Sequence, residues 1–364
     1  MPARRTKTST QLPLFSSMEL ATEPSPFPST RYQGSKRKLL RWIWENVKDL
    51  PFDTVLDVFG GTGAVSHLFK NANKQVTYND NLAFNWNIGL ALIQNADVKL
   101  SIQDIELILE AQSNVVYPDF IQRTFANIYF TDQENAWLDY VTYNIDHFLD
   151  NPIKQALARF ALFQACIIKR PYNLFHRANL YMRHAKVERS FGNKSTWDTP
   201  FDVHFQAFVE EANRAVFDNG RHNQARNLDA QSTPSGFDLV YLDPPYLNTK
   251  GVGVDYRDFY HFLEGLTCYE DWPTQIDLNS KHKRLTPQAS PWNQPKLILN
   301  AFEELISRHR DSILIVSYRD NGIPSKTELQ KLLKMYKRDV REASQAQKYV
   351  LSIQDSHELL FIAV

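Results

Sequence analysis

The residues best suited to chemistry in this chain are an acid, two prolines and a tyrosine in succession, Asp243-Pro244-Pro245-Tyr246. The mostly apolar run 237–242 before them predicts a buried strand that ends at the acid. Pro244 biases Asp243 toward an extended backbone, and neither proline has an N–H to donate. The Asp243 carboxylate and the Pro244 carbonyl can therefore accept hydrogen bonds from one amino group, while the Tyr246 ring offers a flat face to a base. A nucleobase amine suits this loop, and a plain turn after a strand is the alternative.

A glycine-rich turn at residues 60–63 follows a second apolar strand, 54–59. Glycines let the chain turn sharply and let a ligand approach the backbone. The turn matches neither Gly-x-Gly-x-x-Gly nor Gly-Lys-Ser/Thr, so a ligand without a pyrophosphate is favoured over a dinucleotide or a nucleoside triphosphate. Asp80 ends the next strand, 75–80, where an acid accepts hydrogen bonds from ribose hydroxyls. A surface carboxylate at a strand end is the alternative for Asp80.

A third motif, Tyr32-Gln33-Gly34-Ser35-Lys36, precedes apolar residues at helical spacing over 39–47. Backbone N–H groups and Lys36 at such a helix start could hold a carboxylate, which the positive end of the helix dipole favours. A plain helix cap with solvated lysines is the alternative.

The elements that must position these motifs alternate between strand and helix. In the last third of the chain, helices are expected over 297–309 and 324–336, a strand over 312–317, and a terminal strand pair over 349–353 and 359–364. Strand, glycine turn, helix, strand, acid and helix make half of a parallel sheet. We therefore predict a doubly wound, Rossmann-like α/β sheet with an antiparallel ending.

Composition limits the classes of function. The 364 residues are 43% hydrophobic and 23% charged with a formal net charge of +0, so a polyanion must be bound by local basic patches. No apolar run approaches the ~20 residues that span a bilayer, and the start of the chain is polar, so we expect a cytoplasmic protein. Cys166 and Cys268 lack paired spacing, and we expect neither a disulfide nor a metal site.

Residues 101–224 change character, with helical patterns and few buried strands. A basic and aromatic stretch at 169–197 suits DNA, because cations contact phosphates, Arg and Asn read base edges, and rings stack or wedge into a distorted duplex. A solvated basic surface is the alternative. The residues expected to contact DNA are Lys169, Arg170, Tyr172, Asn173, Arg177, Asn179 and Arg183.

Together these motifs resemble those of the Dam-like (alpha-group) adenine-N6 DNA methyltransferases. The matching segments are 32–36, Asp57-Val58-Phe59-Gly60-Gly61-Thr62-Gly63, Asp80 and 243–246, in the same order as in that family. The family holds S-adenosylmethionine with the first two motifs and a flipped adenine with the Asp-Pro-Pro-Tyr loop. The resemblance covers residues 31–100 and 225–364, with Tyr32 where tryptophan is frequent and Ser35 where glycine is frequent.

The resemblance implies roles for individual residues. The implied cofactor site consists of Tyr32, Gly34, Lys36, Asp57, Phe59, Gly61, Thr62, Gly63, Asp80, Asp229 and Asp243. Asp229 is included because an acid near this position touches the cofactor's adenine in that family. The implied catalytic residues are Asp243, Pro244, Pro245 and Tyr246.

The resemblance also implies a domain organisation. Residues 30–100 and 225–364 would form the catalytic domain, and residues 101–224 an inserted, mainly helical target-recognition domain. Residues 1–29, which lack an apolar period, are expected to form a flexible tail.

The implied activity is site-specific methylation of the N6 amine of an adenine in double-stranded DNA, as part of a restriction-modification or related defence system. The adenine must leave the helix, because its amine is inaccessible inside a duplex. Two alternatives stay open. One is another planar amine as acceptor, such as cytosine N4, an RNA adenine or a protein glutamine. The other is a catalytically silent DNA-binding subunit, against which the intact Asp243 and glycine turn argue. A cognate restriction endonuclease is an open partner, and the oligomeric state is not predicted.

Overall fold

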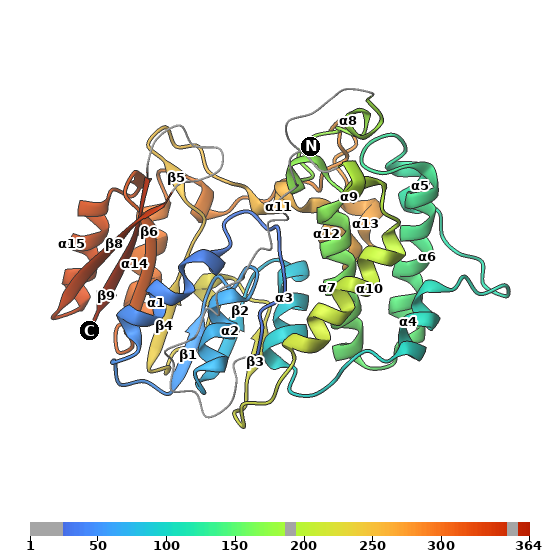
Figure 1. The fold of residues 1–364 in the computed structure, drawn as a ribbon. Coiled ribbons are helices and arrows are strands. Elements are labelled where there is room, and N and C mark those ends of the chain that lie inside the picture. Colours follow the sequence, from blue (N-terminus) through green and yellow to red (C-terminus); the bar gives the residue numbers. More distant parts are fainter. Residues whose placement is uncertain (1–24, 186–193, 348–355) are drawn as a thin grey trace, which may run out of the picture.

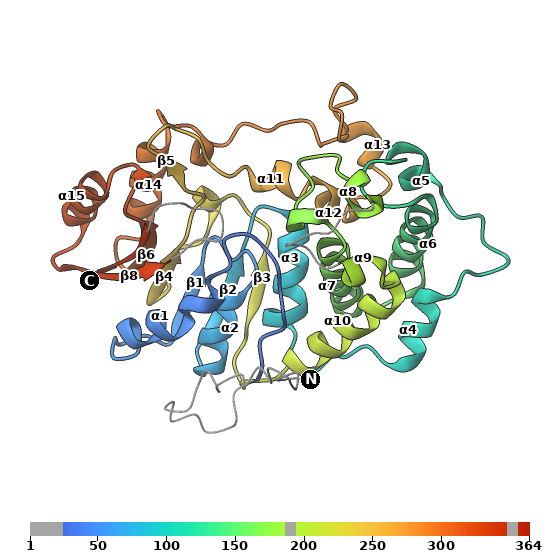
Figure 2. The same ribbon diagram turned by 45° about the horizontal axis from the view of Figure 1, so that its top comes forward.

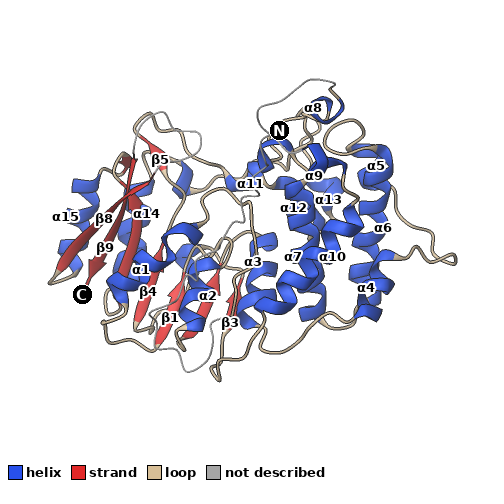
Figure 3. Cartoon of the chain, viewed as in Figure 1, coloured by secondary structure: helices blue, strands red, loops and turns tan. Residues whose placement is uncertain are grey.

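The computed structural model describes residues 25–185, 194–347 and 356–364. A seven-stranded sheet in the order β3-β2-β1-β4-β6-β9-β8 lies at the centre (Figures 1 and 3). The five neighbouring strands β3, β2, β1, β4 and β6 are parallel, and β9 is antiparallel to both of its neighbours. The strands are β1 Thr54–Asp57, β2 Gln75–Asn79, β3 Gln224–Arg226, β4 Leu239–Leu242, β6 Ile313–Arg319, β8 Val340–Gln347 and β9 Ser356–Ala363. The predicted doubly wound α/β fold with an antiparallel ending is confirmed.

Helices cover both faces of the sheet because successive side chains of its buried strands point to opposite sides. Val55 and Tyr241 face one core, and Leu56 and Val240 face the other. The first core is covered by α1 Leu40–Val47, α2 Ala64–Asn71 and α3 Ala83–Gly89, and the second by α14 Ile298–Arg308 and α15 Lys326–Tyr336.

A helical lobe lies beside the sheet (Figures 1 and 2). Its helices from the insert are α4 Ile102–Leu109, α5 Phe120–Thr124, α6 Asp132–Phe148, α7 Pro152–Ile168, α8 Tyr181–His184, α9 Lys194–Asp198 and α10 Phe201–Ala215. The buried helix α7 packs against both α10 and α3, which joins the lobe to the sheet. Helices α12 His261–Leu266 and α13 Trp272–Gln275, which follow the loop 243–246, also pack here through Phe262 and Trp272 on Phe125. The division into functional domains stays a prediction.

Two expectations about the sheet and the tail need correction. The strand expected at 349–353 lies outside the described residues, and the observed partner of β9 is β8, whose exposed edge position gives it no apolar pattern. Residues 1–24 also lie outside the described residues. Residues 25–29, expected in the tail, pack on helix α2: the Ser25 N–H donates to Asn71 Oδ1 at 2.9 Å, and Phe27 lies edge-on to His67. Within the described ranges, no helix has the length and apolar character to cross a bilayer.

Candidate active site

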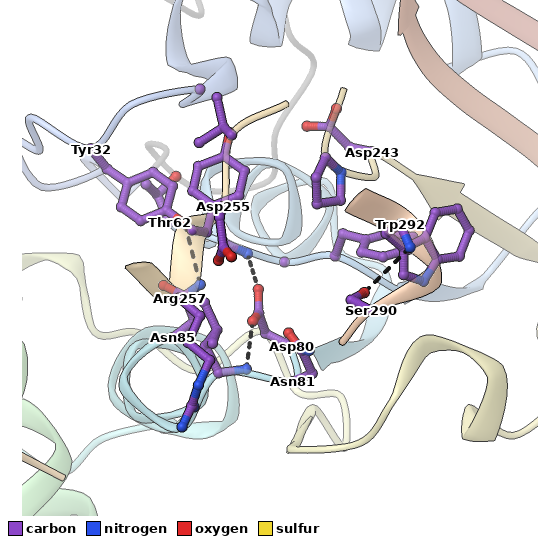
Figure 4. Close-up of a pocket in the computed structure, with 18 of the residues that line it drawn as sticks. Tyr32, Thr62, Asp80, Asn81, Asn85, Asp243, Asp255, Arg257, Ser290 and Trp292 are labelled. Carbon is purple, nitrogen blue, oxygen red and sulfur yellow. Dashed lines mark hydrogen bonds between the residues drawn. The ribbon is translucent and has the colours of Figure 1, made fainter. Parts of the chain in front are cut away.

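Three acids meet at one edge of the sheet because they follow adjacent parallel strands. Asp57 ends β1, Asp80 follows β2, and Asp243 follows β4. The carboxyl ends of parallel strands are where ligands bind in such folds. Here these acids line a cavity of about 210 Å³ (Figure 4).

The glycine turn shapes one wall of this cavity. Gly61 and Gly63 have φ of +50° and +75°, a left-handed conformation that glycine adopts without strain. A Cβ on Gly60 would lie 2.1 Å from the Tyr78 ring, so this position also excludes a side chain. Asp80 Oδ2 accepts the Gly61 N–H at 2.9 Å, which ties the turn to the end of the next strand.

The carboxylates of Asp57 and Asp80 are buried where charge is costly. Asp57 Oδ2 accepts from Ser66 Oγ at 2.7 Å, whereas the buried Oδ1 has no hydrogen-bond partner among the described residues. Burial, reinforced by the charge of Asp243, raises the pKa of Asp57 to about 7. Burial also raises the pKa of Asp80 to about 6, although two backbone N–H groups stabilise its charge. Such unsatisfied, perturbed groups in a cleft mark a ligand site.

Asp243 is held from behind by Lys36. Lys36 Nζ lies 2.9 Å from Asp243 Oδ1 and 2.8 Å from Glu358 Oε1, and its side chain is only 8% exposed. Tyr246 Oη donates to the same Asp243 Oδ1 at 2.5 Å. The expectation that Lys36 holds a ligand's carboxylate is therefore corrected, because its ammonium already binds two carboxylates of the protein.

Most of the residues expected in the site do meet at the cavity. Its lining includes Tyr32, Gly34, Lys36, Asp57, Phe59, Gly61, Thr62, Asp80, Asp229, Asp243 and Pro245. Gly63, Pro244 and Tyr246 are not part of the lining. Gly63 instead caps α2, and Tyr246 packs edge-on against Tyr318 with its hydroxyl turned toward Asp243.

Aromatic residues in the cavity and beside it belong to none of the sequence motifs. Trp292, on the short helix η5 Pro291–Asn293, packs edge-on against Phe59 with ring centroids 4.9 Å apart (Figure 4). Tyr256 and Tyr260 stack on Tyr32, at 5.5 and 4.5 Å, and so anchor the N-terminal motif. These residues come from segments distant in the chain, so only the folded structure shows that they meet.

The cations expected to bind DNA are partly internal. Lys169 and Arg183 both reach Glu134 Oε1, at 2.9 and 2.7 Å, and are buried. Arg170 is 1% exposed, lies over the Tyr129 ring and donates to backbone carbonyls. The structure corrects the prediction for these three residues: their charges are used inside the lobe and offer no surface to a phosphate.

The remaining candidates of this stretch differ in exposure. Tyr172 is 54% exposed, Arg177 is exposed, Asn173 is half-buried, and Asn179 is buried. A second hollow, between α4, α6 and α10, carries the exposed acids Glu106, Glu110 and Glu210. These acids would repel phosphates, so that face of the lobe is unsuited to DNA.

Comparisons with known proteins identify the family of the chain. The family model of D12 class N6 adenine-specific DNA methyltransferases matches residues 32–286. This match includes the glycine turn, the insert and the Asp-Pro-Pro-Tyr loop. The chain belongs to this family and is a DNA methyltransferase that modifies adenine at N6 in a site-specific manner.

Individual relatives cover most of the chain. It is 29% identical to the type II methyltransferase M2.HphI of Haemophilus parahaemolyticus over 350 residues, which are 92% of this chain and 97% of the relative. It is 26% identical over 89% of its length to the type II methyltransferase M.FokI of Planomicrobium okeanokoites, of which the match spans 52%. The type II methyltransferase M.NlaIII of Neisseria lactamica is 21% identical, over 84% of this chain and 88% of the relative.

Proposed function

We propose that the cavity binds S-adenosylmethionine and that Asp243 receives the amine of an adenine flipped out of double-stranded DNA. The observation that carries the proposal is the state of Asp243. Within the described ranges, the hydrogen bonds and ion pairs of its carboxylate all end on Oδ1. Oδ2 is thus left for a substrate, and Asp243 lines the same cavity as the glycine turn and Asp80.

The lining fits the chemical groups of S-adenosylmethionine. Asp57 Oδ1, buried without a donor, suits the ammonium of the methionine end. Asp80 keeps lone pairs for ribose hydroxyls beyond those used by the backbone. The rings of Phe59 and Trp292 offer apolar faces to an adenine. When bound, this cofactor supplies an electrophilic methyl group.

The catalytic loop would act mainly by positioning. The lone pair of an adenine amine is delocalised into the ring, so the amine is a weak nucleophile. Hydrogen bonds from this amine to Asp243 Oδ2 and the Pro244 carbonyl would fix its nitrogen and favour a tetrahedral geometry. As the nitrogen gains the methyl group it loses a proton, which Asp243 is placed to accept. Tyr246 would flank the base while its hydroxyl holds Asp243.

The DNA would lie across the opening of the cavity and the helical lobe. It would not contact the hollow between α4, α6 and α10, which carries exposed acids. Of the residues expected to contact DNA, Tyr172, Asn173 and Arg177 keep exposed surface for it. Because the relatives are type II methyltransferases by name, we propose that this enzyme protects DNA beside a cognate restriction endonuclease.

The test is Asp243→Asn, which keeps the size of the side chain and removes its charge. We expect methylation to fall by about 10³-fold, as when a preorganised electrostatic partner is removed, with S-adenosylmethionine binding retained in calorimetry. Asp139→Asn is the matched control, because Asp139 is a buried acid of the helical lobe that accepts from two backbone N–H groups. Near-normal turnover of Asp243→Asn would contradict the proposal. Nucleoside analysis of the product distinguishes adenine N6 from cytosine N4.

A further inference from the structure

A second buried carboxylate lies directly behind Asp243. Glu358, on β9, has no exposed surface and comes from a strand that carries none of the sequence motifs. Its Oε1 accepts from Lys36 Nζ at 2.8 Å and from Ser317 Oγ at 3.1 Å, and it lies 3.2 Å from Tyr246 Oη, whose one proton points to Asp243 at the shorter distance. Glu358 therefore contacts both groups that hold Asp243, yet it does not line the cavity.

The two carboxylates share one ammonium. Lys36 lies 2.9 Å from Asp243 and 2.8 Å from Glu358, so the cluster holds one positive and two negative charges. In a buried site, an ammonium that pairs with a single carboxylate neutralises the charge of that carboxylate fully. Shared between two, it leaves part of the charge on Asp243.

We propose that Glu358 is a positioning residue for methyl transfer: it anchors Lys36 and Tyr246 against Asp243 Oδ1 and keeps Asp243 Oδ2 a strong acceptor for the adenine amine. This inference rests on the proposed role of Asp243. It assigns the C-terminal strand a part in the chemistry that no motif indicates.

The electrostatic surroundings agree with this role. Burial raises the pKa of Asp243, Lys36 lowers it, and the charge of Glu358 raises it again. Among the described residues, this cluster is also faced by the hydroxyls of Tyr241, Tyr246, Tyr256 and Ser317. Asp57 adds a further negative charge nearby. Without the charge of Glu358, Lys36 would pair with Asp243 alone, so Asp243 would become less basic and a weaker acceptor.

The test is Glu358→Gln, with kcat measured as a function of pH. We expect kcat to fall by about tenfold or more, while the affinity for S-adenosylmethionine changes by less than about threefold. The acid limb of the kcat profile should move to lower pH, because Asp243 loses a neighbouring negative charge that raises its pKa. A purely structural role for Glu358 would lower stability without moving this limb.

Two variants make the outcome decisive. Asp139→Asn removes a buried charge far from the cluster, and it should change the melting temperature but not the acid limb. Ser317→Ala keeps every charge and removes one donor to Glu358, so a kcat loss of about threefold is expected even if Glu358→Gln fails to fold.

The outcomes separate this inference from the proposed function. If Glu358→Gln keeps the wild-type kcat or acid limb while Asp243→Asn is inactive, the inference is wrong and the proposed function stands. If Glu358→Gln does not fold, unchanged kcat in Ser317→Ala overturns the inference. An active Asp243→Asn overturns the proposed function itself.

Discussion

Buried charges are treated in opposite ways in the helical lobe and at the sheet edge. In the lobe, Lys169 and Arg183 enclose Glu134, and despite its burial these two cations lower the pKa of Glu134 to about 2. At the sheet edge, burial instead raises the pKa of Asp57 to about 7, and one oxygen of Asp57 has no donor among the described residues.

This difference separates scaffold from site. A buried charge that has its counter-charge inside the protein holds two parts of the fold together, and removing one partner is costly. A buried charge whose partner is missing is available to a ligand, and its pKa shows that the protein alone does not stabilise it. Residue type does not reveal which of the two applies, since Lys169 and Arg183 look like DNA-binding residues in the sequence.

The largest effect is expected where an acid of the lobe loses its role as counter-charge to two buried cations. Glu134→Ala leaves Lys169 and Arg183 buried without their carboxylate, and we expect the free energy of unfolding to fall by about 3–5 kcal/mol in urea denaturation. Glu110→Ala is the control. It removes an exposed acid of the same lobe and should change the free energy of unfolding by less than about 0.5 kcal/mol. A loss below about 1 kcal/mol in Glu134→Ala would contradict the distinction.

The same pair predicts an acid sensitivity. Because the folded pKa of Glu134 is depressed from 4.5 to about 2, its contribution is fully present above pH 4.5 and is lost as the pH falls toward 2. Stability of the wild type should decline over this window more steeply than that of Glu134→Gln.

The next largest effect concerns Asp57, the buried acid at the sheet edge that has an oxygen without a donor among the described residues. With a pKa of about 7, Asp57 is protonated below that pH, and it must be ionised to receive an ammonium. We expect the affinity for S-adenosylmethionine to be about tenfold weaker at pH 6 than at pH 8 in calorimetry. Two other acids face this site: Asp80, with a pKa of about 6, and Asp243, whose negative charge helps to raise the pKa of Asp57.

The control for this effect is Asp57→Asn, which should bind weakly at both pH values, with a much smaller difference between them. An affinity of the wild type that is constant from pH 6 to 8 would show that Asp57 does not receive the ammonium.

The smallest effect concerns Arg177, an exposed cation of the lobe. Arg177→Ala should weaken DNA binding by a few fold and reduce the slope of log affinity against log salt by about one, with the melting temperature unchanged. Arg214→Ala, an exposed arginine at the end of α10, is the matched control and should alter neither. An equal effect of both variants would argue against DNA contact by Arg177.

The parallel core of the fold could be predicted from the sequence because strands buried on both faces are continuous apolar runs, as in β1 and β4. The short strand β3 and the edge strand β8 could not. Both are largely polar, and their pairing is set by neighbours in space: β3 by β2, and β8 by β9.

The site divides in the same way. Asp57, Asp80 and Asp243 end strands, so their convergence follows from topology and could be anticipated. Glu358 and Trp292 could not be, because each reaches its place through tertiary packing on a residue far away in the chain. The burial of Lys169 likewise depends on a single acid, Glu134, from another helix.

Strand β9 lies between β6 and β8 although it follows both in the chain. During translation the ribosome releases it after the other strands, so a gap in the sheet stays open until then. Glu358 arrives with this strand, and nascent chains that still lack it cannot assemble the cluster around Lys36. Closure of the sheet and assembly of this cluster are thus the same late step of folding.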